Sequence, residues 1–543
     1  MKRSKRLART ARSGDGQQGF HVAMIEQADT PPPVPVVPHG TPVQDIAPSS
    51  AMAAVAADPD HGISDTIWRR AQATRAHVVV DAADYFEQIE TAMMNARQRI
   101  MLIGWDFDTR ISLLRKRRKP GSPPKRLGDF ILYLANRTPG LEIKLLKWNF
   151  GALKMLGRGS TMLDVARWKM HPQIEMKLDS AHPFGCSHHQ KIVVIDDKFA
   201  VCGGIDMTSD RWDTSDHLDD DPRRKRPNRK PYGPWHDVTM MVENAAAAEL
   251  GQLARMRWER AGGGVLEPCA PQKESPWPAS LPAEFQFVEV GISRTRAEYE
   301  GVPPVFEIEK LFLEQIARAK KFIYAENQYF ASRKIAEAIA KRMAEPAPPE
   351  IFIVTAENAD GWLEQKAMDS ARARLIRSIG EKDKNDRFSI NIPYTAGGTG
   401  IYVHAKLTIV DDEILRVGSA NMNNRSLGLD SECDLHIDTT VAGNETAGEA
   451  ITRLRHRLLA EHCGVSPEKM AETLATGLSM REAVARLTQP GRRLTRLELP
   501  ELTDAEKALA DQAMLDPESP DEFFEPFAKK SIFRRSRTLN APD

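Results

Sequence analysis

The chain has 543 residues, and its 75 Lys and Arg residues are balanced by 75 Asp and Glu residues, so the formal net charge is zero. This neutrality argues against a dedicated nucleic-acid coat protein, although local basic patches remain compatible with it. Five cysteines in 543 residues are too few for a disulfide scaffold. None of them forms a CxxC pair, which argues against structural zinc.

Two features of the sequence bear on its location. No apolar run reaches the roughly 18 to 20 residues of a membrane span. The basic N-terminus is not followed by the apolar segment of a secretory signal. We therefore expect a cytoplasmic or peripheral membrane protein, and a leaderless export route stays open.

In chain order, residues 1–65 are predicted to form a disordered tail with a basic tip. Seven prolines fall between Pro31 and Pro48, and such a stretch buries too little apolar surface to offset its ordering entropy. Two basic loops follow further along, at 115–119 and 223–230. Solvated charge and contact with lipid headgroups both remain possible roles for these loops.

Apolar patterning begins near Trp68 and predicts two copies of one α/β unit. In the first copy we expect a strand at 77–80, a helix at 82–96 and a strand at 99–105. The same order returns as a strand at 285–290, a helix at 305–319 and a strand at 322–326. The predicted lobes are 66–262 and 283–487, joined by a Gly/Pro-rich linker at 263–282 and followed by a C-terminal extension at 488–543.

A registered motif, HxKxxxxD, occurs once in each predicted lobe, 215 residues apart. In each copy a glycine follows the aspartate by seven residues, and a polar side chain comes three residues later. The first copy comprises His189, Lys191, Asp196, Gly203 and Asp206. The second comprises His404, Lys406, Asp411, Gly418 and Asn421.

The spacing predicts which side chains act together. Residues two apart on a strand share a face, so each histidine points the same way as the lysine of its motif. Asp196 and Asp411 have the opposite parity. They complete the predicted catalytic motif, but we expect them to fix the strand ends rather than touch the reacting atom. Gly203, Gly204, Gly418 and Ser419 are predicted to let a ligand approach the backbone, with Asp206 and Asn421 beside it.

Two histidines and two lysines at one place suit phosphodiester cleavage. A neutral imidazole can attack phosphorus and form a phosphohistidine. A second, protonated imidazole can donate to the leaving oxygen and then activate water or an alcohol. Two ammonium groups stabilise the developing charge on the non-bridging oxygens. This scheme requires no metal, and we expect no cofactor.

The motif blocks resemble those of the phospholipase D superfamily, in particular its eukaryotic-type branch. HHQKIVVIDD followed by GGID and RWD resembles the first block, and IYVHAKLTIVDD followed by GSANMNNRS and DSE resembles the second. PWHD at 234–237 and ENQYF at 326–330 resemble two further blocks. The resemblance implies two similar α/β lobes, with mixed sheets flanked by helices, that form one shared active site.

The resemblance also implies residue roles. His189 takes the place of the nucleophile and His404 that of the general acid and base. Lys191, Lys406 and Asn421 would bind the phosphoryl oxygens. Glu432 would orient one histidine from the opposite lobe, and Asp213 is the symmetric choice for the other.

The expected function is a phospholipase D that converts glycerophospholipids to phosphatidic acid and a free headgroup, with possible transphosphatidylation. The alternatives are a cardiolipin synthase-like phosphatidyltransferase and, less favoured, a nuclease. We expect a peripheral contact with a phospholipid membrane surface and no nucleic-acid partner. Because both motifs lie on one chain, a monomer can complete the site. The headgroup, the acyl preference and the oligomeric state are left open.

Overall fold

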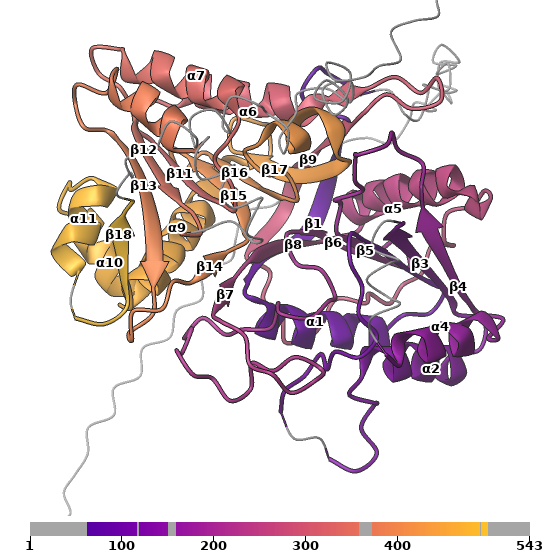
Figure 1. The fold of residues 1–543 in the computed structure, drawn as a ribbon. Helices are drawn as coiled ribbons and strands as arrows, with labels where there is room; N and C mark the ends of the chain where they lie inside the picture. The colour runs from indigo at the N-terminus through magenta and orange to yellow at the C-terminus, as the bar shows by residue number, and fades with distance from the viewer. Residues whose placement is uncertain (1–61, 117–118, 150–158, 358–371, 489, 498–543) are drawn as a thin grey trace, which may run out of the picture. The chain divides into compact units, whose positions relative to one another are not determined.

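The computed structural model describes residues 62–116, 119–149, 159–357, 372–488 and 490–497, all within the compact unit Asp60–Asp543 (Figure 1). Nearly all of the predicted N-terminal tail, and the extension from residue 498 onwards, lie outside these described residues. In the part that is described, no helix combines the length and the apolar character that crossing a membrane requires.

The first lobe alternates strands and helices before the first motif and ends in a long helix. Its elements are β1 (Arg69–Val80), α1 (Ala82–Met94), β2 (Arg99–Gly104), α2 (Leu127–Arg137), β3 (Glu142–Trp148), α4 (Thr161–Lys169), β4 (Ile174–Asp179), β5 (Ile192–Ile195), β6 (Phe199–Gly203), β7 (Trp235–His236), β8 (Val238–Glu243), α5 (Ala245–Trp258) and the π-helical turn η1 (Glu259–Gly263).

The second lobe repeats this order and adds helices at its end. Its elements are β9 (Phe285–Arg296), β10 (Val305–Phe306), α6 (Glu307–Arg318), β11 (Phe322–Asn327), α7 (Arg333–Met343), β12 (Glu350–Val354), β13 (Phe388–Tyr394), β14 (Tyr402–Val403), β15 (Lys406–Val410), β16 (Ile414–Gly418), η2 (Arg425–Leu429), β17 (Glu432–Asp438), η3 (Glu445–Ala447), α9 (Gly448–Cys463), α10 (Pro467–Leu474), α11 (Met480–Leu487) and β18 (Arg493–Arg496).

The two lobes share one strand order, which confirms the predicted fold class. From the centre outwards the first lobe runs β1-β8-β6-β5-β2-β3-β4, and the second runs β9-β17-β16-β15-β11-β12-β13 with β18 added at its edge. In both lobes the outer three strands are parallel, whereas the inner strands are antiparallel. Antiparallel pairing of β1 with β9 joins the lobes into one continuous mixed sheet.

The strands of this sheet are apolar on both faces because helices cover both. In β8, Val238, Met240 and Val242 enter a core shared with α5 and α9, whereas Met241 enters the core under α1 and α2. A third core lies under α6 and α7 in the second lobe. Figure 1 shows α6 and α7 on one face of that half of the sheet and α9–α11 on the other. Coverage on two sides explains the near-continuous apolar runs in the sequence.

Two segments that lie outside the predicted lobes pack against them. The predicted linker packs along the first lobe, where Trp277 and Leu281 are buried in the core that contains α1. The sheet of the second lobe continues past residue 487, because β18 pairs with β13. Both segments are rich in Pro, Gly or charge, and local composition does not reveal that a neighbouring sheet or core accommodates them.

Candidate active site

Both motif histidines line one cleft of about 950 Å³. His189 lies just before β5, and His404 lies just before β15, at equivalent places in the two lobes. The backbone fixes each histidine to the opposite lobe. The His189 N–H donates to the carbonyl of Ser431 at 2.9 Å, and the His404 N–H donates to the carbonyl of His236 at 2.7 Å. The two half-sites therefore meet through pairings that hold both lobes together.

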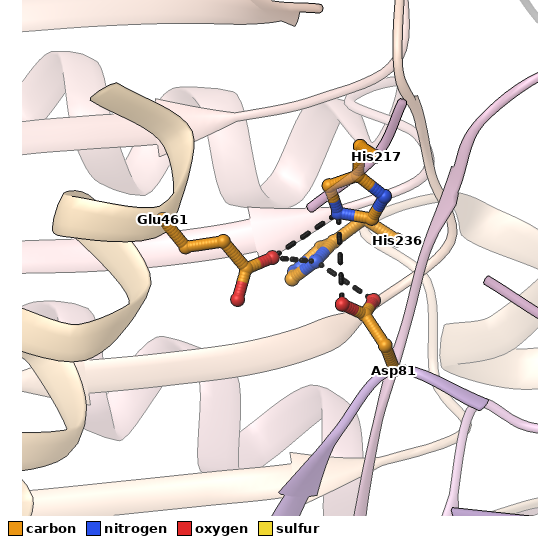
Figure 2. Close-up of side chains that lie close together, drawn as sticks. All are labelled: Asp81, His217, His236 and Glu461. Carbon is orange, nitrogen blue, oxygen red and sulfur yellow. Dashed lines mark hydrogen bonds and ion pairs between the residues drawn. The ribbon is translucent and has the colours of Figure 1, made fainter. Parts of the chain in front are cut away.

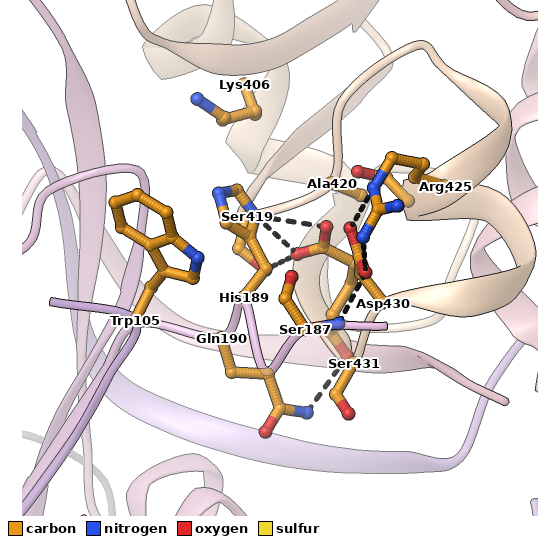
Figure 3. A network of polar contacts seen from close by, with 12 residues as sticks. Trp105, Ser187, His189, Gln190, Lys406, Ser419, Ala420, Arg425, Asp430 and Ser431 are labelled. Carbon is orange, nitrogen blue, oxygen red and sulfur yellow. Dashed lines mark hydrogen bonds and ion pairs between the residues drawn. The ribbon is translucent and has the colours of Figure 1, made fainter. Parts of the chain in front are cut away.

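A carboxylate from the opposite lobe lies against each imidazole. Glu432 of the second lobe is 3.0 Å from Nδ1 of His189, and Asp237 of the first lobe is 2.8 Å from Nδ1 of His404. Each carboxylate accepts from Nδ1–H, which leaves the lone pair on Nε2. Ser419 in turn donates its hydroxyl to Glu432 at 2.5 Å. Figure 3 shows His189 between Trp105 and this group of polar residues.

The expectation that Asp213 orients the second histidine is wrong. Its fully buried carboxylate accepts from Nδ1 of His217 at 2.9 Å, from Arg224 at 3.1 Å and from the Trp235 amide at 2.9 Å. Asp213 therefore stabilises the loop that leads to β7. A signal for Asp237 was present in the sequence, because Asp237 immediately precedes strand β8, as Glu432 begins the equivalent strand β17.

Each motif lysine contacts the backbone of the histidine in its own motif. Lys191 donates to the carbonyl of His189 at 2.8 Å and lies 3.4 Å from the carboxylate of Asp206. Lys406 donates to the carbonyl of His404 and, at 3.2 Å, to the side-chain oxygen of Gln328. Burial lowers the pKa of Lys406 to about 7, and repulsion from Lys191 acts in the same direction.

Burial also sets the protonation of the imidazole–carboxylate pairs. It lowers the pKa of His189 well below the usual value, helped by repulsion from Lys191 and Lys406. The pKa of His404 is lowered in the same way. Burial raises the pKa of Glu432 to about 8 and that of Asp237 to about 7. In each imidazole–carboxylate pair, a neutral imidazole and a neutral carboxyl group are therefore favoured. This holds until a bound anion offsets the positive charge of the two lysines.

The glycines near the motifs make room for carboxylates rather than for a ligand, which corrects the prediction. A Cβ on Gly204 would overlap the Asp237 carboxylate, and one on Gly418 would overlap that of Asp434. A Cβ on Gly203 would collide with Thr239. Ser419 lies behind Glu432 rather than in the cleft. Of the predicted substrate contacts, only two line the cleft: Asp206 and Asn421.

The motif aspartates lie at the far ends of their strands, away from the cleft. Asp196 accepts the backbone amides of 97–99 at 2.7 to 2.8 Å. Asp411 accepts those of 320–322 at the same distances. These contacts agree with the expected role at the strand ends, and they keep both aspartates away from the reacting atom.

Aromatic side chains form the walls of the cleft near both histidines. Trp105 stacks on Trp148 with ring centroids 5.8 Å apart, on the His189 side. Trp235 stacks on Tyr402 at 4.5 Å and lies 5.2 Å from the His404 ring. The two Trp235 neighbours come from β14 and the start of β15, so this wall also joins the lobes.

Outside the cleft, four buried groups converge at one point (Figure 2). We call Asp81, His217, His236 and Glu461 the buried four-residue cluster. Glu461 lies 3.2 Å from Nε2 of His217 and 3.0 Å from Nδ1 of His236. That Nδ1 atom makes no hydrogen bond. Two imidazoles and two carboxylates could hold a divalent cation. The acidic groups also raise the pKa of both histidines against the effect of burial, so protons can balance the charge.

Comparison with known families follows the same division into lobes. A family model described as "Phospholipase D" matches residues 92–275. A second, described as "Cardiolipin synthase, PLD-like domain", matches residues 312–456. The crystal structure of a phosphatidylserine synthase from Haemophilus influenzae superposes with a TM-score of 0.51 at 12% identity. It covers 81% of this chain and 92% of that one, which supports the fold.

Several phospholipases D are similar to this chain over about 70% of its length. Phospholipase D A of Dictyostelium discoideum is 26% identical over 466 residues, which covers 72% of this chain and 35% of the relative. Phospholipase D1 of Saccharomyces cerevisiae is 27% identical, with coverages of 71% and 28%. Phospholipase D alpha 1 of Carica papaya is 24% identical, with coverages of 71% and 64%.

The alignments thus span less than two thirds of each of these relatives. The two family models, however, cover the first motif with residues 92–275 and the second with residues 312–456. Together with the shared strand order and the paired histidines, these matches show that the chain belongs to the phospholipase D superfamily of phosphodiesterase-type enzymes.

Proposed function

We propose that the protein is a phospholipase D that hydrolyses glycerophospholipids to phosphatidic acid and a free headgroup. One observation carries the proposal. Two imidazoles, each backed by a carboxylate of the opposite lobe, line a single cleft, and each motif lysine donates to the carbonyl of its own histidine. This arrangement supplies a nucleophile, an acid and charge stabilisation for a phosphodiester.

The first step forms a phosphatidyl-enzyme. Nε2 of neutral His189 attacks phosphorus, and a P–N bond forms as the bond from phosphorus to the headgroup oxygen breaks. His404, protonated once the substrate anion is bound, gives its proton to that oxygen. Lys191, Lys406 and Asn421 would hold the non-bridging oxygens. The lowered pKa of His189 keeps it unprotonated and therefore nucleophilic.

The second step hydrolyses the phosphatidyl-enzyme and regenerates the free enzyme. His404, now neutral, takes a proton from water, and the water oxygen attacks phosphorus. The P–N bond breaks, which releases phosphatidic acid and restores neutral His189. Asp237 stabilises the imidazolium that forms on His404 in this step. A primary alcohol in place of water would give a phosphatidyl-alcohol.

A second candidate is a phosphatidyltransferase, in which a lipid hydroxyl accepts the phosphatidyl group. The match of residues 312–456 to a model described as cardiolipin synthase favours keeping it. The phosphatidyl-enzyme would be the same, so only the acceptor separates the two activities.

We also propose that the protein binds a bilayer peripherally. The basic loops contribute less than their sequence suggests, because Arg224 is buried against Asp213, while Arg223 and Arg226 pair with aspartates. Between residues 162 and 184, however, five large apolar side chains are exposed: Met162, Leu163, Met170, Leu178 and Phe184. Exposed apolar groups beside basic ones suit insertion at a headgroup boundary.

Vesicle binding tests this contact. Replacing Leu163 and Phe184 by Glu should weaken co-sedimentation with mixed phospholipid vesicles, as should neutralising Lys225, Arg229 and Lys230 with Arg224 kept. Unchanged co-sedimentation of both variants would reject the proposed surface.

The activity is tested by incubating the protein with mixed phospholipid vesicles and a short primary alcohol. We expect a phosphatidyl-alcohol and phosphatidic acid from the wild type and neither from His189→Ala. Adding phosphatidylglycerol as acceptor distinguishes the phosphatidyltransferase from the hydrolase. A phosphatidyltransferase would form a diphosphatidyl product in preference to phosphatidic acid. A folded wild-type protein that yields no lipid product would reject both lipid activities.

A further inference from the structure

Two arginines occupy related positions in the lobes, and both line the cleft. In the second lobe, Arg425 donates to the Asp430 carboxylate at 2.8 and 3.1 Å. In the first lobe, the guanidinium carbon of Arg211 lies 4.2 Å from the centroid of the Trp235 ring. Asp430 and Trp235 are equivalent residues, since each stands two positions before the carboxylate that orients a histidine. The same place thus holds a carboxylate in one lobe and an indole in the other.

Arg211 therefore lacks the carboxylate ion pair that holds Arg425. Its recorded hydrogen bond is a long one, 3.5 Å, from Nη1 to the carbonyl of Asp210. Its buried Nε has no partner, and no carboxylate of the described residues forms an ion pair with it. A guanidinium stacked on an indole keeps its charge and its outer N–H groups available.

The carboxylates that line the cleft are, in contrast, already paired. Asp106 lies 2.6 Å from Lys147, and Asp206 lies 3.4 Å from Lys191. Asp210 lies 2.8 Å from Arg226, and Asp430 binds Arg425. An ammonium headgroup would find no unpaired carboxylate among the described lining residues. One face of Trp235, which could otherwise hold a cation, already carries Arg211.

The position of Arg211 relates its charge to one end of the substrate. Trp235 lies 5.2 Å from His404, and the Arg211 charge helps to lower the pKa of His404. In the proposed mechanism His404 protonates the departing headgroup oxygen, so Arg211 lies on the headgroup side of phosphorus.

We propose that Arg211 is a specificity-determining residue that binds an anionic oxygen of the headgroup. The preferred substrates are then glycerophospholipids whose headgroup carries a carboxylate or a phosphate beyond the scissile phosphodiester. This inference rests on the proposed phospholipase D activity. It selects one headgroup class that the shared machinery of the two lobes would not distinguish.

The test compares two lipids that differ only in a carboxylate. Dihexanoyl-phosphatidylserine and dihexanoyl-phosphatidylethanolamine are presented as monomers, so surface charge does not contribute. A charge-assisted hydrogen bond should make wild-type kcat/KM about 10- to 100-fold higher for the serine lipid. Arg211→Ala should reduce the ratio of kcat/KM for the serine lipid to that for the ethanolamine lipid to about one.

Two further variants control for folding and for long-range charge. Arg211→Lys keeps the charge without the planar fork and should retain part of the preference. Lys225→Gln removes one positive charge from the basic loop at 223–230 without releasing a cleft carboxylate, and it should leave the serine preference intact. An equal loss on both lipids in Arg211→Ala, or no serine preference in the wild type, would overturn the inference.

A binding measurement separates this inference from the activity itself. By calorimetry, O-phospho-L-serine should bind the wild type at least tenfold more tightly than phosphoethanolamine, and Arg211→Ala should abolish the difference. Equal affinities would reject the role of Arg211 even in an active enzyme. If neither lipid is cleaved but the binding preference is present, the proposed function fails while the anion site stands.

Discussion

Replacing Asp237 by Asn should cost most of the activity while leaving the fold intact. Asp237 is fully buried, and its carboxylate lies 2.8 Å from Nδ1 of His404. An amide fills the same space beside Gly204 but cannot stabilise the imidazolium. Loss of a buried, charge-assisted contact of this kind costs about 3 to 4 kcal/mol in the transition state. Since each 1.36 kcal/mol is a factor of ten, we expect kcat to fall roughly 10²- to 10³-fold.

The matched control is Asp213→Asn, the other aspartate that sequence alone would favour. It should lower the melting temperature, because Arg224 loses a buried partner, yet keep kcat within tenfold. Steady-state headgroup release and thermal unfolding of both variants give the comparison. A kcat above a third of the wild-type value in Asp237→Asn, or a larger loss in Asp213→Asn, would refute the assignment.

Three other outcomes follow from the site. Gly204→Ala should lower kcat about 10- to 100-fold with KM little changed, since the new methyl displaces the Asp237 carboxylate, and unaltered kinetics would contradict this. Lys406 loses its charge as pH rises through about 7, so kcat/KM should fall more steeply above that pH. Lys406→Arg stays charged, so it should be less active but show a shallower fall. An unchanged pH profile in that variant would exclude Lys406 as the cause of the steeper fall. A divalent cation that binds the buried four-residue cluster should raise the free energy of unfolding by about 2.7 kcal/mol when its concentration is 100 times its Kd at pH 8. The same concentration should have a smaller effect at pH 5.5, where protons compete for the histidines. Glu461→Gln should abolish the rise in melting temperature, and an equal rise in that variant would place the ion elsewhere.

The sequence predicts the parts of this molecule that depend on local pattern. The near-continuous apolar runs predict the strands, and the repeated HxK spacing places His189 and Lys191 on one face. Glu432 lies where the motif resemblance suggested. These features can be predicted because they depend only on neighbouring residues or on a repeated register.

Features that depend on packing between distant segments were beyond that reasoning. Asp237 was marked only by its place before a strand, and the pairing of β8 with β6 is what brings it to His404. The glycines read equally well as ligand contacts until the carboxylates of the adjacent strands are in place. The stacking of Arg211 on Trp235 joins residues 24 positions apart through an irregular loop, which no periodicity predicts.

Direct trapping of the phosphatidyl-enzyme tests the mechanism most sharply. A phosphatidyl ester of p-nitrophenol needs no acid for its first step, so His404→Ala should form the adduct and fail to hydrolyse it. We predict a burst of one p-nitrophenol per enzyme and a phosphatidyl mass on the peptide that contains His189. Full turnover without an adduct, or an adduct on any other residue, would contradict nucleophilic attack by His189.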